Sequence, residues 1–308
     1  MLQVEGLSKK YGKLTAVDEL SFKVDEGAIF GFIGPNGAGK TTTFKILATL
    51  LRPSSGKAWI DGEEVISDPR RIRQLVGYMP DFFGVYDDLK VDEYLDFYGA
   101  SYGIPSARRK KTIDELLELV DLSHKREAYV DSLSRGMKQR LCLTRCLIHD
   151  PRLLILDEPA SGLDPRARLE VKEILKELKS MGKTIIVSSH ILSEMAEICT
   201  HMGIIEAGQM VVSGTVEEIM QRTREGQSLE IKVMEKTAEA EAVLRDEMNM
   251  NVLNTADRIL ELPFSGDEQE MNRILTALMQ AEIPVVSFSL SRSKLEDVFM
   301  QITRGVVQ

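Results

Sequence analysis

The stretch Gly34-Pro35-Asn36-Gly37-Ala38-Gly39-Lys40-Thr41 follows the pattern G-x-x-x-x-G-K-[ST] and restricts how the chain around it can fold. Its glycines allow backbone conformations that a side chain would block, so successive N–H groups can point at phosphate oxygens. A helix that begins at Lys40 would direct the positive end of its dipole at the same anion. The stretch therefore predicts a phosphate-binding loop between a strand and a helix.

The sequence on either side of this loop meets that requirement. Ala28–Ile33 is a short apolar run between glycines, as in a buried strand, and Lys40–Leu51 has apolar residues at helical spacing that stop before Arg52-Pro53. Upstream, short apolar alternations over Leu2–Gly31 predict antiparallel strands. Downstream, strands alternate with helices, which favours a largely parallel sheet with helices on both faces. The downstream elements expected are strands at Ala58–Ile60, Leu75–Met79, Leu153–Leu156 and Thr184–Ser188, and a helix at Arg166–Ser180.

Two other regions have a different character. Helical periodicity dominates from about residue 90 to 148, which predicts an α-helical insertion with helices at Val91–Tyr102, at Ala107–Val120 and from Arg135. The polar stretch Gln221–Gln227 predicts a linker, and we place the domains at 1–222 and 223–308. The second domain has the order βαββαβ of a ferredoxin-like module. Its expected elements are Leu229–Val233, Thr237–Glu247, Asn251–Leu253, Arg258–Leu262, Glu268–Gln280 and Pro284–Phe288, then a last helix at Ser293–Ile302.

Composition excludes several classes of function. A net charge of −9 argues against a nucleic-acid footprint, and the basic run Arg108–Lys111 is expected to be a solvated helix face. No stretch approaches about 18 consecutive apolar residues, so no membrane span is expected. Cys142 and Cys146 share one face of an apolar helix, where buried small side chains are a better interpretation than metal ligands.

The loop and a second acidic centre together predict nucleotide chemistry. Lys40 can reach the β- and γ-phosphates of ATP, and the Thr41 hydroxyl can ligate Mg²⁺. The apolar strand Leu153–Leu156 ends in two carboxylates, of which Asp157 can hold Mg²⁺ and Glu158 can polarise an attacking water as general base. A strand that ends in an acidic turn is common, but the phosphate loop favours the catalytic interpretation.

Five linked motifs carry a resemblance to a known family. They are the phosphate loop, Leu133-Ser-Arg-Gly-Met-Lys-Gln-Arg140, Leu156-Asp-Glu-Pro159, Ser161-Gly-Leu-Asp164 and Ser188-Ser-His190. In order and spacing they resemble ABC transporter ATPases, and the match covers about residues 2 to 216. The resemblance implies an α/β fold, namely a P-loop NTPase cassette with an antiparallel β subdomain and an α-helical subdomain, followed here by the small α+β domain.

The resemblance also implies roles for residues at the matching positions. Tyr11 corresponds to an aromatic that stacks on adenine, and His190 to a switch histidine that contacts the γ-phosphate, as a third catalytic residue beside Lys40 and Glu158. Ser134 and Gly136 correspond to a signature that caps ATP bound to a partner subunit, and Asp164 to a residue that couples the two sites. The nucleotide would also contact the whole loop from Gly34 through Pro35, Asn36, Gly37, Ala38, Gly39, Lys40 and Thr41 to Thr42.

The chain departs from the family pattern at three positions. Arg135 replaces the first glycine of the signature Leu-Ser-Gly-Gly-Gln, and Met137 replaces its glutamine. Asp81 stands where the family has glutamine after Gly77-Tyr-Met-Pro80. A carboxylate can still ligate Mg²⁺, so the predicted metal ligands are Thr41, Asp81 and Asp157.

The C-terminal segment Ser293-Lys-Leu-Glu-Asp-Val-Phe299 is similar to the extension of ABC ATPases that serve drug, sodium and antibiotic-resistance exporters. This resemblance implies a separate multi-span membrane permease, export as the direction of transport, and a cytoplasmic chain held at the inner face of the membrane. The extension is equally consistent with a packing or dimerisation module. The aromatic residues Phe82, Phe83 and Tyr86 are candidates for the permease contact, and the permease would select the transported substrate.

One phosphate loop and one signature in one chain imply a second cassette, either an identical copy or a paralogue. The main alternative is a soluble ABC ATPase that acts on a ribosome or another macromolecule. A regulator that binds nucleotide without hydrolysis is a second alternative, which the presence of Lys40, Asp157, Glu158 and His190 disfavours.

Overall fold

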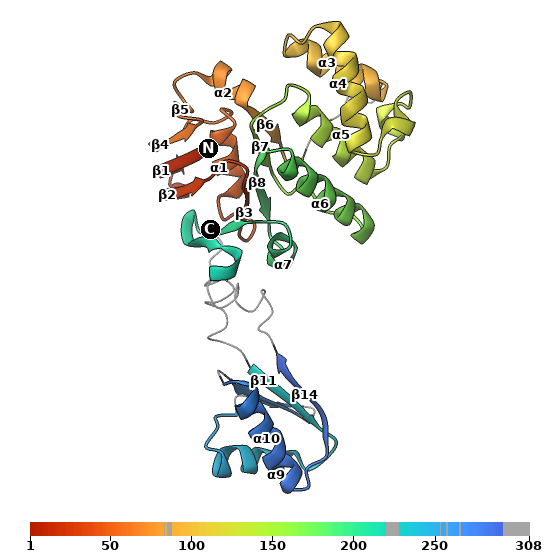
Figure 1. Ribbon diagram of the computed structural model, residues 1–308. Helices are drawn as coiled ribbons and strands as arrows, with labels where there is room; N and C mark the ends of the chain where they lie inside the picture. The colour runs from red at the N-terminus through yellow and green to blue at the C-terminus, as the bar shows by residue number, and fades with distance from the viewer. Residues whose placement is uncertain are drawn as a thin grey trace. The chain divides into compact units, whose positions relative to one another are not determined.

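The computed structural model describes residues 1–82, 84, 88–219, 228–252, 254–256, 258–264 and 266–291. The chain divides into two compact units, of which the first is Met1–Val216 and the second begins at Glu217 (Figure 1). The predicted linker Gln221–Gln227, the last predicted helix Ser293–Ile302, and the docking candidates Phe83 and Tyr86 lie outside the described residues. Among those described, no helix is both long enough and apolar enough to span a membrane.

A six-stranded sheet forms the centre of the first unit, and five of its strands are parallel. The phosphate-loop strand lies in the middle of the sheet, and the acidic strand lies two places away. Both are buried along their whole length, as the near-continuous apolar runs predict. The order is β10 (Gln209–Thr215, antiparallel), β9 (His201–Glu206), β3 (Ile29–Ile33), β8 (Thr184–Ser189), β7 (Leu153–Leu156) and β6 (Val76–Met79).

An antiparallel sheet packs against one side of this centre. Phe22 of the antiparallel sheet contacts Phe30 and Phe32 of β3, with ring centroids 5.5 and 5.4 Å apart. Phe32 in turn contacts Phe44 of α1 (Lys40–Leu47) at 5.6 Å, so one aromatic cluster joins the antiparallel sheet, β3 and the phosphate-loop helix. The strands are β2 (Leu14–Val24), β1 (Leu2–Tyr11), β4 (Ser55–Ile60) and β5 (Glu63–Glu64), in that order.

Helix α1 is shorter than the predicted Lys40–Leu51. It ends at Leu47 because the backbone of Thr49 turns into the left-handed region, with φ of 62°. The N–H groups of Leu50 and Leu51 then bond to the carbonyl of Lys45, which satisfies one of the last carbonyls of the helix. The other helices beside the central sheet are α2 (Pro69–Leu75), α6 (Pro165–Ser180) and α7 (Leu192–Ala196).

The helical insertion is present, with α3 (Val91–Ser101), α4 (Ser106–Leu119) and α5 (Arg135–Leu147). Short 3₁₀ turns at Ser123–Lys125 and Val130–Ser132 connect α4 to α5. Figure 1 shows this bundle to one side of the central sheet, beyond β6 and β7. Cys142 and Cys146 of α5 are both buried, as predicted.

The basic run on α4 is not wholly a solvated face, and the prediction is wrong for Arg109. Its guanidinium bonds both carboxylate oxygens of Asp96, at 2.6 and 3.0 Å, and donates to the Ile104 carbonyl at 2.7 Å. The side chain therefore joins α4 to α3, a role that the sequence of the run alone does not reveal. Lys111 pairs within its own helix, with Glu115 at 3.5 Å.

The second unit has the predicted order βαββαβ. Its four strands form an antiparallel sheet in the order β12-β13-β11-β14, with an apolar core that includes Leu229, Ile231, Leu260, Ile274 and Leu278. Strand β12 lies at Asn254–Ala256, three residues after its predicted start at Asn251. The remaining elements are β11 (Ser228–Val233), α9 (Thr237–Ala242), a π-helical turn (Val243–Glu247), β13 (Ile259–Pro263), α10 (Glu268–Gln280) and β14 (Val285–Ser291).

Candidate functional site

The phosphate loop runs from the end of β3 to the start of α1, and two of its glycines are required by their surroundings. A Cβ atom on Gly34 would lie 2.3 Å from the Ile205 carbonyl oxygen, and one on Gly39 would lie 2.5 Å from that of Ala16. Gly39 also has φ of 105°, a conformation that residues with side chains rarely adopt. The neighbouring backbone therefore fixes the loop in a shape that only glycine allows.

Lys40 places its ammonium group against the inside of this loop. Its side chain is 6% exposed, and Nζ donates to the carbonyl oxygens of Gly34 at 2.7 Å and Pro35 at 3.1 Å. Burial lowers the pKa of Lys40, while the negative charges of Glu158 and Asp157 oppose that shift. The loop thus holds a cation beside the N-terminus of α1, where the helix dipole favours an anion.

Asp157 links three segments at the end of β7. It is fully buried, and its two carboxylate oxygens accept from the Thr41 hydroxyl at 2.7 Å and the Ser188 hydroxyl at 2.6 Å. Its N–H donates to the Met79 carbonyl at 2.8 Å, which continues the pairing with β6. The carboxyl ends of the parallel strands therefore bring Thr41 and Asp157 together, as the sequence predicts.

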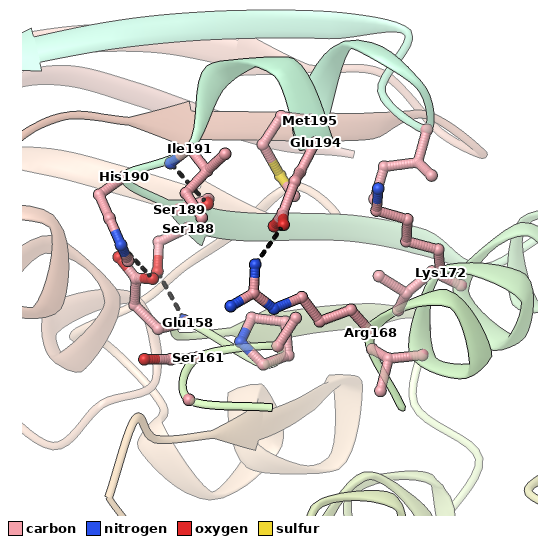
Figure 2. Close-up of a pocket in the computed structure, with 16 residues that line it drawn as sticks. Glu158, Ser161, Arg168, Lys172, Ser188, Ser189, His190, Ile191, Glu194 and Met195 are labelled. Carbon is pink, nitrogen blue, oxygen red and sulfur yellow. Dashed lines mark hydrogen bonds and ion pairs between the residues drawn. The ribbon is translucent and has the colours of Figure 1, made fainter. Parts of the chain in front are cut away.

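Glu158 lies beside Asp157 but points elsewhere. Its backbone is in the left-handed region, with φ of 50°, and its N–H donates to the Ser188 hydroxyl at 2.9 Å. One carboxylate oxygen lies 2.9 Å from Nδ1 of His190, as Figure 2 shows. The other lies 3.6 Å from Lys40 Nζ and has no hydrogen-bond partner among the described residues. A mostly buried carboxylate with one free oxygen can accept a proton from a bound water.

A second group of predicted residues surrounds a different pocket. Ser134 caps α5 by accepting from the Met137 N–H at 3.3 Å, and Asp164 caps α6 by accepting from the Ala167 N–H at 3.0 Å. A Cβ on Gly136 would lie 3.2 Å from that of Ala167, so the two helix starts approach closely. The pocket between them has a volume of about 220 Å³ and is lined by Ser134, Gly136 and Asp164. None of these three residues lines the pocket that contains Glu158 and His190.

The remaining predicted positions have fewer contacts. Tyr11 is an exposed residue at the end of β1, with Lys9 Nζ 5.2 Å from its ring centroid. Asp81 is exposed after β6, near enough for its charge to raise the pKa of Lys40 against the larger effect of burial. In the loop, Asn36 is exposed and Thr42 is half-buried. Within the described part of the chain, no group of three or more His, Cys, Asp or Glu side chains could hold a metal ion.

Sequence reasoning assigned no role to two side chains of this region. Ser188 contacts both Asp157 and the Glu158 N–H, and the signal available was a polar residue at the end of an apolar strand. Gln139 is buried and donates to the Pro159 carbonyl at 2.7 Å, which joins α5 to the loop after Glu158. Arg135 is recognisable as a departure, but only the structure shows that it donates to the Ser161 carbonyl at 3.3 Å.

Two family profiles match this chain. The one described as ABC transporter matches residues 17–161, and the one described as ATP-binding protein DrrA1-3-like, C-terminal domain, matches residues 214–303. The linearmycin resistance ATP-binding protein LnrL of Bacillus subtilis is 31% identical over 98% of this chain and 98% of its own length. The chain belongs to the ABC transporter family as an ATP-binding protein.

Other matches agree with this assignment. The bacitracin transport ATP-binding protein BcrA of Bacillus licheniformis is 34% identical over 99% of this chain and 98% of its own length. A solved structure of the ATP-binding subunit of an ABC transporter superposes with a TM-score of 0.66 at 31% identity, over 72% of this chain and 92% of the other. ABC cassettes hydrolyse ATP to drive transport, so the chain is an ATP hydrolase. The ribosomal alternative has no support among these matches.

Proposed function

We propose that this ABC protein powers export through a separate membrane permease, by closure of two cassettes around MgATP. The observation that carries the proposal is the convergence of Lys40, Thr41, Asp157, Glu158 and His190 at one end of the central sheet. The names of the relatives, which refer to linearmycin resistance and bacitracin transport, support export of a small molecule. The permease would choose that molecule, because the described residues contain no membrane-spanning helix that could form a pathway.

The residues at Asp157 fit a magnesium ion bound together with nucleotide. Thr41 and Asp157 bring a hydroxyl and a carboxylate oxygen within 2.7 Å of each other, and such hard oxygens are preferred by Mg²⁺. Mg²⁺ usually retains waters and phosphate oxygens, so a full cage of protein ligands is not required. Thr41, Asp157 and, from the exposed loop, Asp81 would hold the ion. Bound there, it would neutralise charge on the β- and γ-phosphates.

The other residues take the roles that the family resemblance implies, and their positions are compatible with those roles. The Gly34–Thr42 loop and Lys40 bind the phosphates, and Tyr11 stacks on the adenine. Glu158 accepts a proton from the water that attacks the γ-phosphorus, and the bond to the ADP oxygen breaks. His190, 2.9 Å from Glu158, orients that carboxylate and contacts the γ-phosphate.

The second pocket supports a composite site. Ser134, Gly136 and Asp164 line it at two helix N-termini, where backbone N–H groups can face an anion. A partner cassette, identical or paralogous, would place its own ATP there. Phe82 is 90% exposed and is the described candidate for the permease contact, at the cytoplasmic face of the membrane.

The experiment that tests this function is the size of the purified chain in solution, with and without MgATP, for wild type and Glu158→Gln. Loss of the general base should trap a dimer that forms only with MgATP, while wild type hydrolyses ATP and returns to monomer. Adding Lys40→Ala to Glu158→Gln should abolish the dimer by removing phosphate binding. A Glu158→Gln chain that hydrolyses ATP like wild type would contradict the assigned base.

A further inference from the structure

Arg168, on the first turn of α6, joins two segments on either side of the catalytic residues. Its Nε donates to the Leu163 carbonyl at 2.9 Å, and Nη1 donates to a Glu194 carboxylate oxygen at 2.9 Å. Figure 2 shows the bond to Glu194 across the pocket. A guanidinium can make both bonds at once because its donors lie in a rigid fork, which a lysine ammonium lacks.

The two partners of Arg168 belong to functionally different segments. Leu163 is in the loop Ser161–Asp164, which contributes Asp164 to the pocket assigned above to the partner's nucleotide. Glu194 is on α7, four residues after His190, whose Nδ1 lies 2.9 Å from Glu158. Glu158 is thus connected to His190 by two routes. One is their direct contact, and the other runs along the loop to Leu163, through Arg168 to Glu194, and along the chain back to His190.

Two buried side chains, Leu192 and Met195, pack α7 against the core, and the Arg168–Glu194 ion pair joins it to α6. The helix has five residues, and a cavity of about 120 Å³ lies beside it. The cavity is lined from α6 by Val171 and Leu175 and from α7 by Met195, so apolar packing between the two helices is incomplete. Arg168 and Glu194 are only 34% and 17% exposed, which makes their ion pair less screened than a surface pair. The ion pair is thus one of the links that set the position of α7, beside the packing of its buried side chains.

We propose that Arg168 is a positioning residue that couples the loop Ser161–Asp164 to His190. A partner cassette that contacts the loop would then shift the Leu163 carbonyl, and Arg168 would pass the shift through Glu194 to the His190–Glu158 pair. Hydrolysis would be fastest only when the partner is in place. This inference rests on the composite site proposed above, and it adds a route by which the second pocket influences the first.

The chain contains a matched control for this link. Lys172, one turn further along α6, pairs with Glu197 at 3.0 Å and is 14% exposed. This second ion pair joins α6 to the same region after His190, but none of its bonds in the described structure reaches the loop. A variant at Lys172 therefore removes an ion pair between the same two regions, one whose Glu197 is 63% exposed, and leaves the coupling intact.

The test is steady-state ATP hydrolysis by the full chain with wild type, Arg168→Gln, Arg168→Lys, Glu194→Gln, the double variant Arg168→Gln/Glu194→Gln, and Lys172→Gln. Misplacement of His190 should lower kcat by between about tenfold and a hundredfold in Arg168→Gln, with KM for ATP within about twofold of wild type. Arg168→Lys keeps the charge opposite Glu194 and should recover part of kcat. The double variant should be no slower than Arg168→Gln, since both changes break one link.

Several results would overturn the inference. A kcat for Arg168→Gln no lower than that for Lys172→Gln would show that the link does not act on catalysis. Losses that multiply in the double variant would show that Arg168 and Glu194 act separately. If thermal unfolding shows that Arg168→Gln does not fold, the nearly isosteric Glu194→Gln takes its place. A kcat for Glu194→Gln no lower than that for Lys172→Gln would then overturn the inference. A wild type that fails to hydrolyse ATP would instead contradict the proposed function itself.

Discussion

At the scale of single residues, the backbone conformation decides where the side chains of two adjacent carboxylates point. Asp157 and Glu158 are neighbours in sequence, yet each oxygen of Asp157 accepts from one hydroxyl group while Glu158 keeps one oxygen without a hydrogen-bond partner in the described structure. The left-handed φ of Glu158 separates the two side chains, so one faces Thr41 and the other faces Lys40 and His190. Residue type alone would not distinguish a metal ligand from a base here.

The departure at Asp81 has a measurable consequence. Asp81→Gln should retain ATPase activity but raise the Mg²⁺ concentration for half-maximal activity by a few-fold, because a neutral amide oxygen is a weaker ligand than a carboxylate. A Mg²⁺ titration of ATPase activity would measure this. Asp88→Asn, which removes a charge from a nearby exposed position, is the control. An unchanged titration for Asp81→Gln would argue against a metal contact.

His149 should make stability depend on pH. Its ring stacks on Tyr102 with centroids 3.9 Å apart, its Nε2 lies 3.1 Å from the Val76 carbonyl, and its Nδ1 is buried with no partner among the described residues. Burial lowers the pKa of His149 below its usual 6.5. The unfolded chain then binds the proton more tightly, so this contribution is complete above pH 6.5 and is lost as pH falls through the folded pKa.

Urea unfolding at several pH values would measure that loss. His149→Gln can still donate to Val76 and should flatten the decline in unfolding free energy below pH 6.5. His124→Gln, at an exposed histidine, is the control. An identical slope for wild type and His149→Gln would contradict the assignment.

Contacts between two motifs of fixed local geometry could be predicted from the sequence. Contacts that depend on how segments distant in the sequence pack together could not. Thr41 and Asp157 meet as expected, and Lys40 lies against the loop, because the loop and the strand end each have a fixed local geometry. Ser188 and Arg168 were not predicted, since their partners lie about 30 positions away and depend on how β8 and α7 pack.

At the scale of elements, the phosphate loop allows a clean comparison of two glycines. Gly37 and Gly39 both have positive φ, but a Cβ on Gly37 would meet open space while one on Gly39 would meet the Ala16 carbonyl at 2.5 Å. Gly37→Ala should cost about 1–2 kcal/mol of stability from backbone strain alone. Gly39→Ala should cost more and weaken ATP binding at least about tenfold, because the start of α1 must move. Urea unfolding and ATP titration would measure both, and equal effects would refute the steric argument.

Helices and strands were predicted correctly where the spacing of apolar residues and the length of the segment indicated the same element. Strands β7 and β8 lie where short apolar runs predicted them, and α10 has the predicted bounds Glu268–Gln280. The strands β9 and β10 were missed. Strand β9 pairs with β3 and β10 pairs with β9, and their place at this end of the sheet depends on long-range pairing that local pattern does not encode. The early end of α1 likewise reflects a backbone turn at Thr49 that no proline or glycine signals.

At the scale of the whole molecule, two separate apolar cores predict two unfolding events. The first contains Phe32 and Phe44 beside the phosphate loop, and the second contains Leu229 and Leu278. MgATP at about 100 times its Kd should stabilise the first unit by about 2.7 kcal/mol and leave the second unchanged. Calorimetry would resolve the two transitions, and Lys40→Ala should abolish the shift. A single transition, or an equal shift of both, would show that the units unfold together.

The left-handed backbone of Glu158 also bears on how such chains evolve. A glutamate in that conformation costs on the order of 1 kcal/mol that a glycine or asparagine would not. Replacing Glu158 by glycine or asparagine would therefore stabilise the fold, and only natural selection for ATP turnover keeps the glutamate. In a lineage that has lost the need to turn over ATP, drift should replace Glu158 by glycine or asparagine early, while the Gly34–Thr42 loop persists for as long as binding alone is useful.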